Sequence, residues 1–160
     1  MKRIEDPIEE MLVFHKEVSK QLDLLEGSLK KFKKKMRLDG MRLALEGFFF
    51  FVRTDLNLHI KDEEKALFPV LRTRKNLEKD IEKIMDDHDY LLTSVNIMKL
   101  LKGMKKEAYT EIENKTAKII ETLRDHVWIE DNVVFKFAQE NLTGTQIAEV
   151  ANKMNKFRSM

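Results

Sequence analysis

The chain has 160 residues and a mass of 19.0 kDa, which suits one compact domain, and we expect a single domain over residues 1–160. With only 5 Gly and 2 Pro, the chain has too few turn-forming residues for an all-β fold of short strands. The 30 Lys and Arg almost balance the 28 Asp and Glu, so the net charge does not point to a nucleic-acid partner.

Helix breakers and capping residues divide the chain into four long predicted helices and a short fifth. Pro7 opens the first helix, because a proline at the first helical position loses no hydrogen bond. Asp39-Gly40 is predicted to be the turn before the second helix, and Pro69 to make its last turn irregular. Gly103 is expected to close the third. The predicted helices span about residues 7–36, 41–72, 75–101, 109–140 and 146–157.

The connections between the long helices are short, so consecutive helices should run antiparallel. The predicted fold class is therefore all-α, an up-down-up-down antiparallel four-helix bundle with a short C-terminal fifth helix. Lysines cluster between residues 30 and 35 and between residues 102 and 106, both at predicted helix C-termini. Cations there offset the negative end of the helix dipole, and we favour this interpretation over a nucleic-acid surface.

The N-terminal segment is charged and has no apolar region of the kind found in signal peptides. No uncharged stretch approaches the length of about 18 residues that a transmembrane helix needs. We therefore expect a cytoplasmic protein with no membrane and no nucleic acid among its partners, either a monomer or a weak homo-oligomer.

All four histidines of the chain interrupt apolar series that repeat every seven residues. His15, for example, stands between Ile8 and Leu22 on the first helix. On the second and fourth helices a glutamate follows the histidine after four residues, which puts both side chains on one face. The polar residues at predicted core positions are His15, His59, Glu63, His88, His126 and Glu130.

Buried carboxylates without a partner cost several kcal/mol, roughly, and no Lys or Arg stands nearby on these faces. Metal ions would satisfy both the carboxylates and the imidazoles. Because the chain has no cysteine, nitrogen and oxygen would have to hold such ions. The order His, His-x-x-x-Glu occurs twice, so we predict two half-sites that face each other and bind two metal ions through all six residues.

Two other interpretations compete with this one. Ferritin-like di-iron sites use Glu-x-x-His, and the positions three residues before the histidines are apolar here: Leu12, Leu56, Met85 and Leu123. That class of site is excluded. The other interpretation is a metal-free helical interaction module in which the histidines are structural.

The order of four histidines and two glutamates resembles the hemerythrin-like (HHE cation-binding) family over nearly the whole chain. This resemblance implies a non-haem di-iron centre in a four-helix bundle, which binds or reacts with dioxygen and related small ligands. It makes His15 and His59 ligands of one iron, His88 and His126 ligands of the other, and Glu63 and Glu130 the bridging carboxylates. Manganese and zinc suit the same donors but are less favoured.

Two departures from the oxygen-carrying hemerythrins affect the expected function. Those proteins have a fifth histidine at the position of Leu92, and His-x-x-x-x-Asp where this chain has His126-x-x-x-Glu130. The resemblance then implies an open position on both irons. We therefore expect a protein that binds dioxygen, nitric oxide or peroxide, in oxygen or iron binding or in sensing. The alternative is an enzyme that reduces peroxide or nitric oxide or oxidises ferrous iron.

Metal-bound imidazoles usually donate their other N–H to a carboxylate or carbonyl. Four acidic residues are close enough in sequence to do this: Asp62, Glu64, Asp87 and Asp131. We prefer Glu64 for such a role and expect most of the others to be solvated surface charges.

Overall fold

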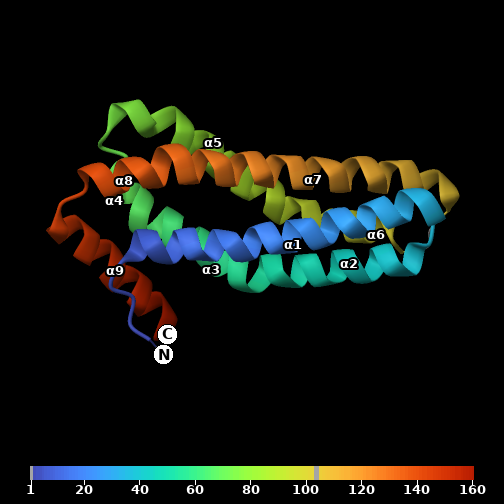
Figure 1. Cartoon of the computed structure of the whole chain (residues 1–160), viewed down its shortest axis with the longest axis horizontal. Coiled ribbons are helices and arrows are strands. Elements are labelled where there is room, and N and C mark those ends of the chain that lie inside the picture. The colour runs from blue at the N-terminus through green and yellow to red at the C-terminus, as the bar shows by residue number, and fades with distance from the viewer. Residues whose placement is uncertain (1, 103–104) are drawn as a thin grey trace.

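The computed structural model describes residues 2–102 and 105–160, and this part of the chain is helical with no strand (Figure 1). The predicted all-α class is confirmed. Gly103, the predicted end of the third helix, lies outside the described residues. Among the described helices, none combines the length and the apolar character needed to cross a membrane.

The first helix, α1 (Pro7–Lys35), ends one residue before the predicted position. The Asp6 side chain caps its N-terminus by accepting a hydrogen bond from the Glu9 backbone N–H at 3.1 Å. At the other end Met36 adopts the left-handed conformation with φ of 52°, and its N–H donates to the Phe32 carbonyl at 2.8 Å. Both ends are thus closed by local hydrogen bonds.

One continuous helical stretch follows, in which α geometry twice gives way to π geometry. Its segments are α2 (Leu38–Phe51), the π-helix η1 (Val52–Leu56), α3 (Asn57–Lys61), the π-helix η2 (Asp62–Leu67) and α4 (Phe68–Leu71). The predicted turn at Asp39-Gly40 is wrong, because α2 already begins at Leu38. Asp39 lies in the first helical turn, where its negative charge is favourable. The last turn, predicted to be irregular at Pro69, is the α-helical α4, and the π geometry lies before it in η2.

The third and fourth stretches also combine several segments. The third contains the 3₁₀-helix η3 (Lys75–Leu77), α5 (Glu78–Thr93), the 3₁₀-helix η4 (Ser94–Asn96) and α6 (Ile97–Leu100). The fourth contains the 3₁₀-helix η5 (Lys106–Ala108), α7 (Tyr109–Ile129), the π-helix η6 (Glu130–Val134) and α8 (Phe135–Asn141). Their overall spans agree with the predicted third and fourth helices.

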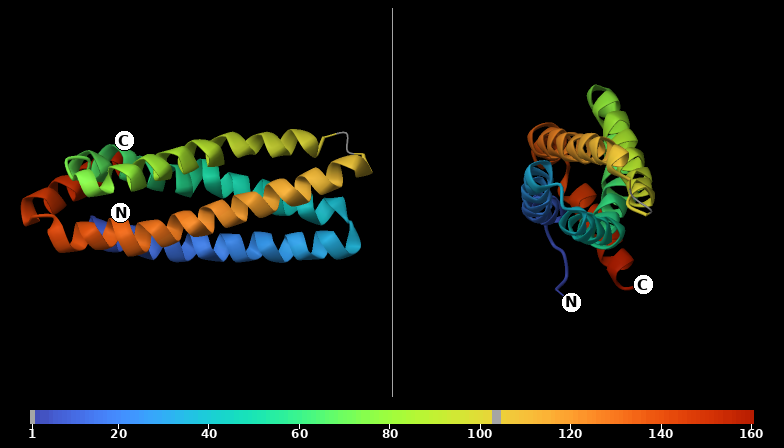
Figure 2. Two further views of the ribbon diagram at one scale, coloured as in Figure 1. Left: turned by 90° about the horizontal axis from the view of Figure 1, so that it is seen from above. Right: turned by 90° about the vertical axis from the view of Figure 1, so that its right-hand side faces the viewer.

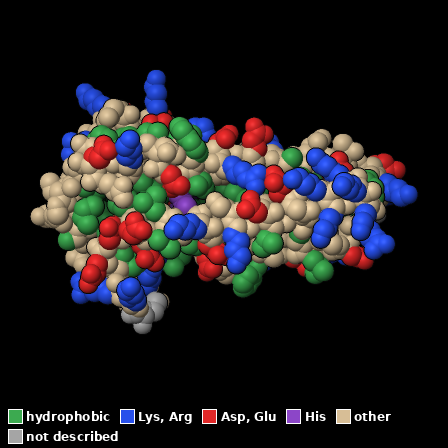
Figure 3. Space-filling model, viewed as in Figure 1, with side chains coloured by type: hydrophobic (Ala, Val, Ile, Leu, Met, Phe, Trp, Pro, Cys, Tyr) green, Lys and Arg blue, Asp and Glu red, His purple; other side chains and the backbone are tan. Residues whose placement is uncertain are grey.

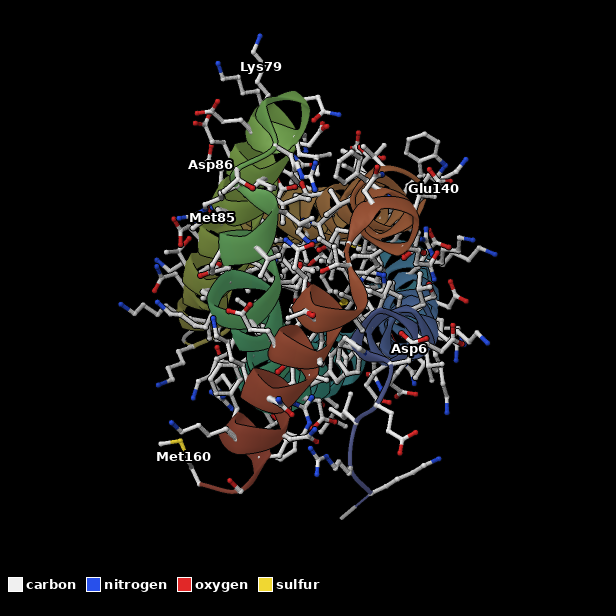
Figure 4. The ribbon with its side chains drawn as sticks, turned by 90° about the vertical axis from the view of Figure 1, so that its left-hand side faces the viewer. Asp6, Lys79, Met85, Asp86, Glu140 and Met160 are labelled. Carbon is white, nitrogen blue, oxygen red and sulfur yellow. The ribbon has the colours of Figure 1, made fainter. Side chains whose placement is uncertain are left out.

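The last helix, α9 (Gly144–Arg158), crosses one end of the bundle (Figure 4). Thr143 and Gln146 form a capping box at its start: the Gln146 N–H donates to Thr143 Oγ1 at 3.2 Å, and the Thr143 N–H donates to Gln146 Oε1 at 3.0 Å. Asn155 binds both backbone groups of Ile4, at 2.8 and 2.9 Å. The N-terminal segment and α9 therefore hold each other at the same end of the molecule.

The four long stretches lie side by side around a shared interior, so the molecule is a helical bundle (Figure 2). Two apolar clusters fill this interior. The first, with Leu25, Phe32 and Leu45, lies toward the α1–α2 connection, and the second, with Phe68 and Phe135, lies toward α9. Between them is a layer of buried polar residues.

Candidate metal centre

The layer between the two apolar clusters consists of the polar residues that the sequence singles out. We call these residues the polar layer, and all of them are buried: His15, His59, Glu63, His88, His126 and Glu130. Their positions follow from the helices, because each helix contributes apolar residues to one cluster before these polar positions and to the other cluster after them. Figure 3 shows only a small spot of histidine surface on the face in view.

The polar layer forms two groups of four residues. Within each group, the potential ligand atoms all lie within 4.8 Å of one another. One group contains His15 and His59, and the other contains His88 and His126; Glu63 and Glu130 belong to both. Each group could hold a metal ion. The two shared carboxylates lie between the two pairs of histidines, as bridging groups would.

Short contacts join these side chains through their Nε2 atoms. His126 Nε2 lies 2.8 Å from Glu130 Oε1, and His15 Nε2 lies 3.3 Å from the same oxygen. His15 and His59 bring their Nε2 atoms within 3.1 Å of each other. Like nitrogens at this distance repel unless a proton or a cation lies between them.

These contacts leave most of the acceptors without a proper hydrogen bond. Both carboxylate oxygens of Glu63 and Glu130, and Nε2 of His88, are buried without a hydrogen-bond partner in the described protein. Among the described residues no Lys or Arg pairs with either glutamate. Buried carboxylates in this condition cost folding free energy. A donor set of imidazole nitrogen and carboxylate oxygen fits iron, manganese or zinc, so the residues fit a bound cation.

Three of the four histidines have their outer nitrogen, Nδ1, bound to a carboxylate. The pairs are His15 with Asp131 at 2.6 Å, His88 with Glu64 at 2.7 Å and His126 with Asp87 at 3.2 Å. When Nδ1–H donates to a carboxylate, the lone pair of Nε2 is left for a metal and the ring orientation is fixed. The expectation for Glu64 is confirmed, but Asp87 and Asp131 are not the mere surface charges that we expected.

His59 differs, since no hydrogen bond to its Nδ1 is found among the described residues. Its ring is stacked instead on Phe14, with the ring centroids 4.6 Å apart. Asp62, the fourth acidic residue considered, does not reach a histidine. It is 2 % exposed, and its oxygens accept two hydrogen bonds from the Arg158 guanidinium at 2.9 and 2.7 Å.

The protonation states at neutral pH suit metal binding. Burial alone would raise the pKa of Glu63, but the neighbouring histidines, His59 above all, lower it to about 2. Burial lowers the pKa of His126, although Asp87 favours the charged form. Glu63 is thus a carboxylate and His126 a neutral imidazole, which are the forms that coordinate metals.

Both glutamates of the polar layer lie in π-helical segments. Glu63 is the second residue of η2 and Glu130 the first of η6. Pro69 follows η2 closely and could have explained the first irregularity, but no proline follows η6. Each of these two segments contains a glutamate of the polar layer, whereas the π-segment η1 contains none, and π-segments within α-helices are frequent at functional sites. The sequence pattern gave no sign of these segments.

Leu92, the position of the fifth histidine in oxygen carriers, does not lie in the centre. It is 39 % exposed, whereas its neighbour Leu91 is buried in the first apolar cluster. The polar layer already includes all 4 histidines of the chain. The centre therefore offers two histidines on each side and no more.

Comparison with protein-family models shows which family this chain resembles. The family model described as hemerythrin HHE cation binding domain matches residues 6–138. No curated protein and no solved structure matches the chain significantly. The matched range includes the whole polar layer and its three carboxylate partners, and it ends before α9 begins. Since it covers most of the chain, this protein belongs to the hemerythrin HHE cation-binding family.

Proposed function

We propose that this chain is a non-haem di-iron protein. His15 and His59 would hold one iron, His88 and His126 the other, and Glu63 and Glu130 would bridge them. The observation that carries the proposal is the sharing of two buried glutamates, without hydrogen-bond partners, by two otherwise separate groups of histidines. The donor set would accept iron, manganese or zinc. We prefer iron because the resemblance to the family implies a di-iron centre.

The proposal extends to the architecture and to the ligand. Residues 1–160 would form a single hemerythrin-like domain with an up-down-up-down antiparallel bundle, and the packing of α9 on α1 and η2 supports the inclusion of the C-terminal helix. The protein would bind dioxygen, nitric oxide or peroxide, in oxygen or iron binding or in sensing. A bound iron pair would supply Lewis-acid sites and changes of oxidation state.

The residues around the centre would control which molecules reach it. The two apolar clusters above and below the polar layer leave it with little exposed surface, and the carboxylates on Nδ1 of three histidines keep those rings in place. Such a site favours small ligands of low polarity.

Metal analysis combined with an absorption spectrum of the oxidised protein tests the proposal. We expect about two irons per chain after expression with iron, because each of the two groups of the centre could hold one metal ion. The variants Glu63→Ala and His126→Ala should lose most of this iron. Glu111→Ala, an exposed change on α7, is the matched control and should keep it. Unchanged iron content in both site variants would contradict the ligand assignment.

Exposure of the reduced protein to oxygen separates binding from catalysis. A stable, reversible oxygen adduct formed by the anaerobically reduced protein would support binding or sensing. Immediate oxidation with repeated consumption of peroxide would support the alternative of an enzyme.

A further inference from the structure

The two halves of the polar layer differ at one position next to a histidine. In the second half Asp87 directly precedes His88 and binds Nδ1 of His126 at 3.2 Å. In the first half the residue that precedes His15 is Phe14, which stacks on His59. The phenylalanine thus occupies the place of the missing carboxylate. His59 is the one histidine of the four whose outer nitrogen has no hydrogen bond among the described residues.

A pocket of about 280 Å³ adjoins this histidine. His59 is 5 % exposed and lines the pocket together with Phe14, while Asp55 and Glu10 on the rim are exposed to solvent. The pocket therefore leads from the surface to a buried side chain of the polar layer. Its walls come from α1, from η1 to η2, and from α9.

The charges that line this pocket are mostly negative. Glu10, Glu17, Asp55 and Asp62 face one cation, Arg158, and the guanidinium of Arg158 is already bound to Asp62. A pocket lined with one sign of charge raises the local concentration of ions of the opposite sign. A neutral molecule such as dioxygen gains nothing from these carboxylates, but a divalent cation does.

We propose that divalent cations enter and leave the centre through this acidic pocket and that His59 is the ligand that releases first. The inference rests on the proposed function, because it requires metal ions in the polar layer. Loss of a carboxylate partner typically weakens a metal-binding histidine by about 10-fold to 100-fold. The ion held by His15 and His59 is therefore the more labile one.

The first test supplies the missing carboxylate. The variant Phe14→Asp puts an acid where Asp87 stands in the other half, and Phe14→Leu removes the ring without adding an acid. Protein loaded anaerobically with ferrous ion is mixed with a coloured ferrous chelator, and the release rate is followed by absorbance. We expect F14D to slow the release of the first ion by about 10-fold or more, and F14L not to slow it.

The second test concerns the charge of the rim. The double variant Glu10→Gln with Asp55→Asn removes the two exposed acids of the rim, and Glu111→Gln with Glu121→Gln removes two exposed acids from α7 as the matched control. We expect the rim variant to take up ferrous ion several-fold more slowly than the parent at low salt. The difference should shrink at high salt, where surface charges are screened, and the α7 variant should match the parent.

The outcomes separate the two proposals. In two cases the route through the pocket is overturned and the metal centre stands, provided that the parent binds two ions. In the first case F14D releases the ions at the parent's rate, and in the second the rim variant takes them up at the parent's rate. A parent that binds fewer than about one ion per chain overturns the metal centre itself. If F14D does not fold, as judged by circular dichroism, the rim variant decides alone.

Discussion

The side chains next to each histidine determine how its ring is held. Glu64 and Asp131 directly follow Glu63 and Glu130, and each binds a histidine on a helix far away in sequence. A glutamate followed directly by a second acid thus occurs in both halves of the chain, and this repeat is visible in the sequence as a sign of the carboxylates that bind the histidines. By contrast, no local pattern links Asp62 to Arg158, which lie 96 residues apart, because only the packing of α9 brings them together.

Protonation of the layer should make the metal-free protein sensitive to acid. The folded-state pKa of His126 lies below its ordinary value of 6.5, and that of Glu63, at about 2, lies below 4.5. In both cases the unfolded chain binds the proton at a higher pH than the folded protein does, so stability falls as the pH falls. The loss begins below about pH 6.5 with His126 and continues below about pH 4.5 with Glu63.

Urea unfolding of the metal-free protein at a series of pH values checks this. The urea concentration at the midpoint should decrease as the pH is lowered from about 7 to about 4. His126→Gln removes one of the two groups and should make the fall shallower in the upper part of this range. A midpoint that stays constant or rises toward acid would contradict the predicted protonation states.

At the scale of elements, the heptad pattern predicts the buried face across η1 but only up to η2 and η6. Along the second helical stretch Phe49, Leu56 and Glu63 are buried as predicted, but Val70, next in the series, is only half-buried. In the fourth, Phe137 departs from its series in the same way after Glu130. In η2 and η6 a π turn holds one residue more than an α turn, so the residues that follow are offset from the heptad pattern, and the types of residue do not reveal this offset. The positions of the helices along the chain were therefore predictable, whereas the face that each helix buries beyond the centre was not.

The π-segment η6 should be required for the position of Glu130. Deletion of Asn132, an exposed residue inside η6, would remove the extra residue of the π turn and return this segment to α geometry, with the helices on either side left in register. Glu130 would then lose the backbone geometry that directs it into the polar layer, while Phe135 keeps its place in the second apolar cluster. We expect a helical protein with less bound iron and a lower melting temperature.

The control for this deletion is Asn132→Ala, which keeps the chain length and removes only the hydrogen bond to the Trp128 carbonyl. Iron content and thermal melts of the two variants are compared. Equal iron content and equal melting temperature would show that the π-segment is dispensable.

The C-terminal helix α9 should be held to the bundle by the pair of Arg158 and Asp62. Arg158 is partly buried, with 19 % of its side chain exposed, and Arg158→Ala would leave the Asp62 carboxylate buried without its partner. We expect a loss of about 3 kcal/mol in the free energy of unfolding, measured with urea. Arg158→Ala combined with Asp62→Asn removes the buried charge as well and should lose less than Arg158→Ala alone. A double variant that is less stable than the single one would contradict this account.

At the scale of the whole molecule, the lysine-rich end and the polar layer lie at different places along the bundle. Lys and Arg side chains gather toward the end with the α1–α2 connection (Figure 3), where Lys33, Lys34 and Lys35 form the last turn of α1. Cations at this position stabilise the helix end. The polar layer lies instead between the two apolar clusters, nearer to α9, so that the α1–α2 end is free to stabilise the bundle without taking part in the centre.

This separation predicts where metal binding stabilises the protein. Each iron would join side chains from different helices, so any local opening that separates them would have to release the metal. Fraying at the α1–α2 end breaks no such bond. Hydrogen exchange of iron-loaded and iron-free protein should therefore differ most in residues 56–67 and 123–135, and little in residues 25–48. The Glu63→Ala variant, treated with iron in the same way, should show no such difference. An equal gain in protection along the whole bundle would contradict the prediction, because it would mean that iron protects the protein only against global unfolding.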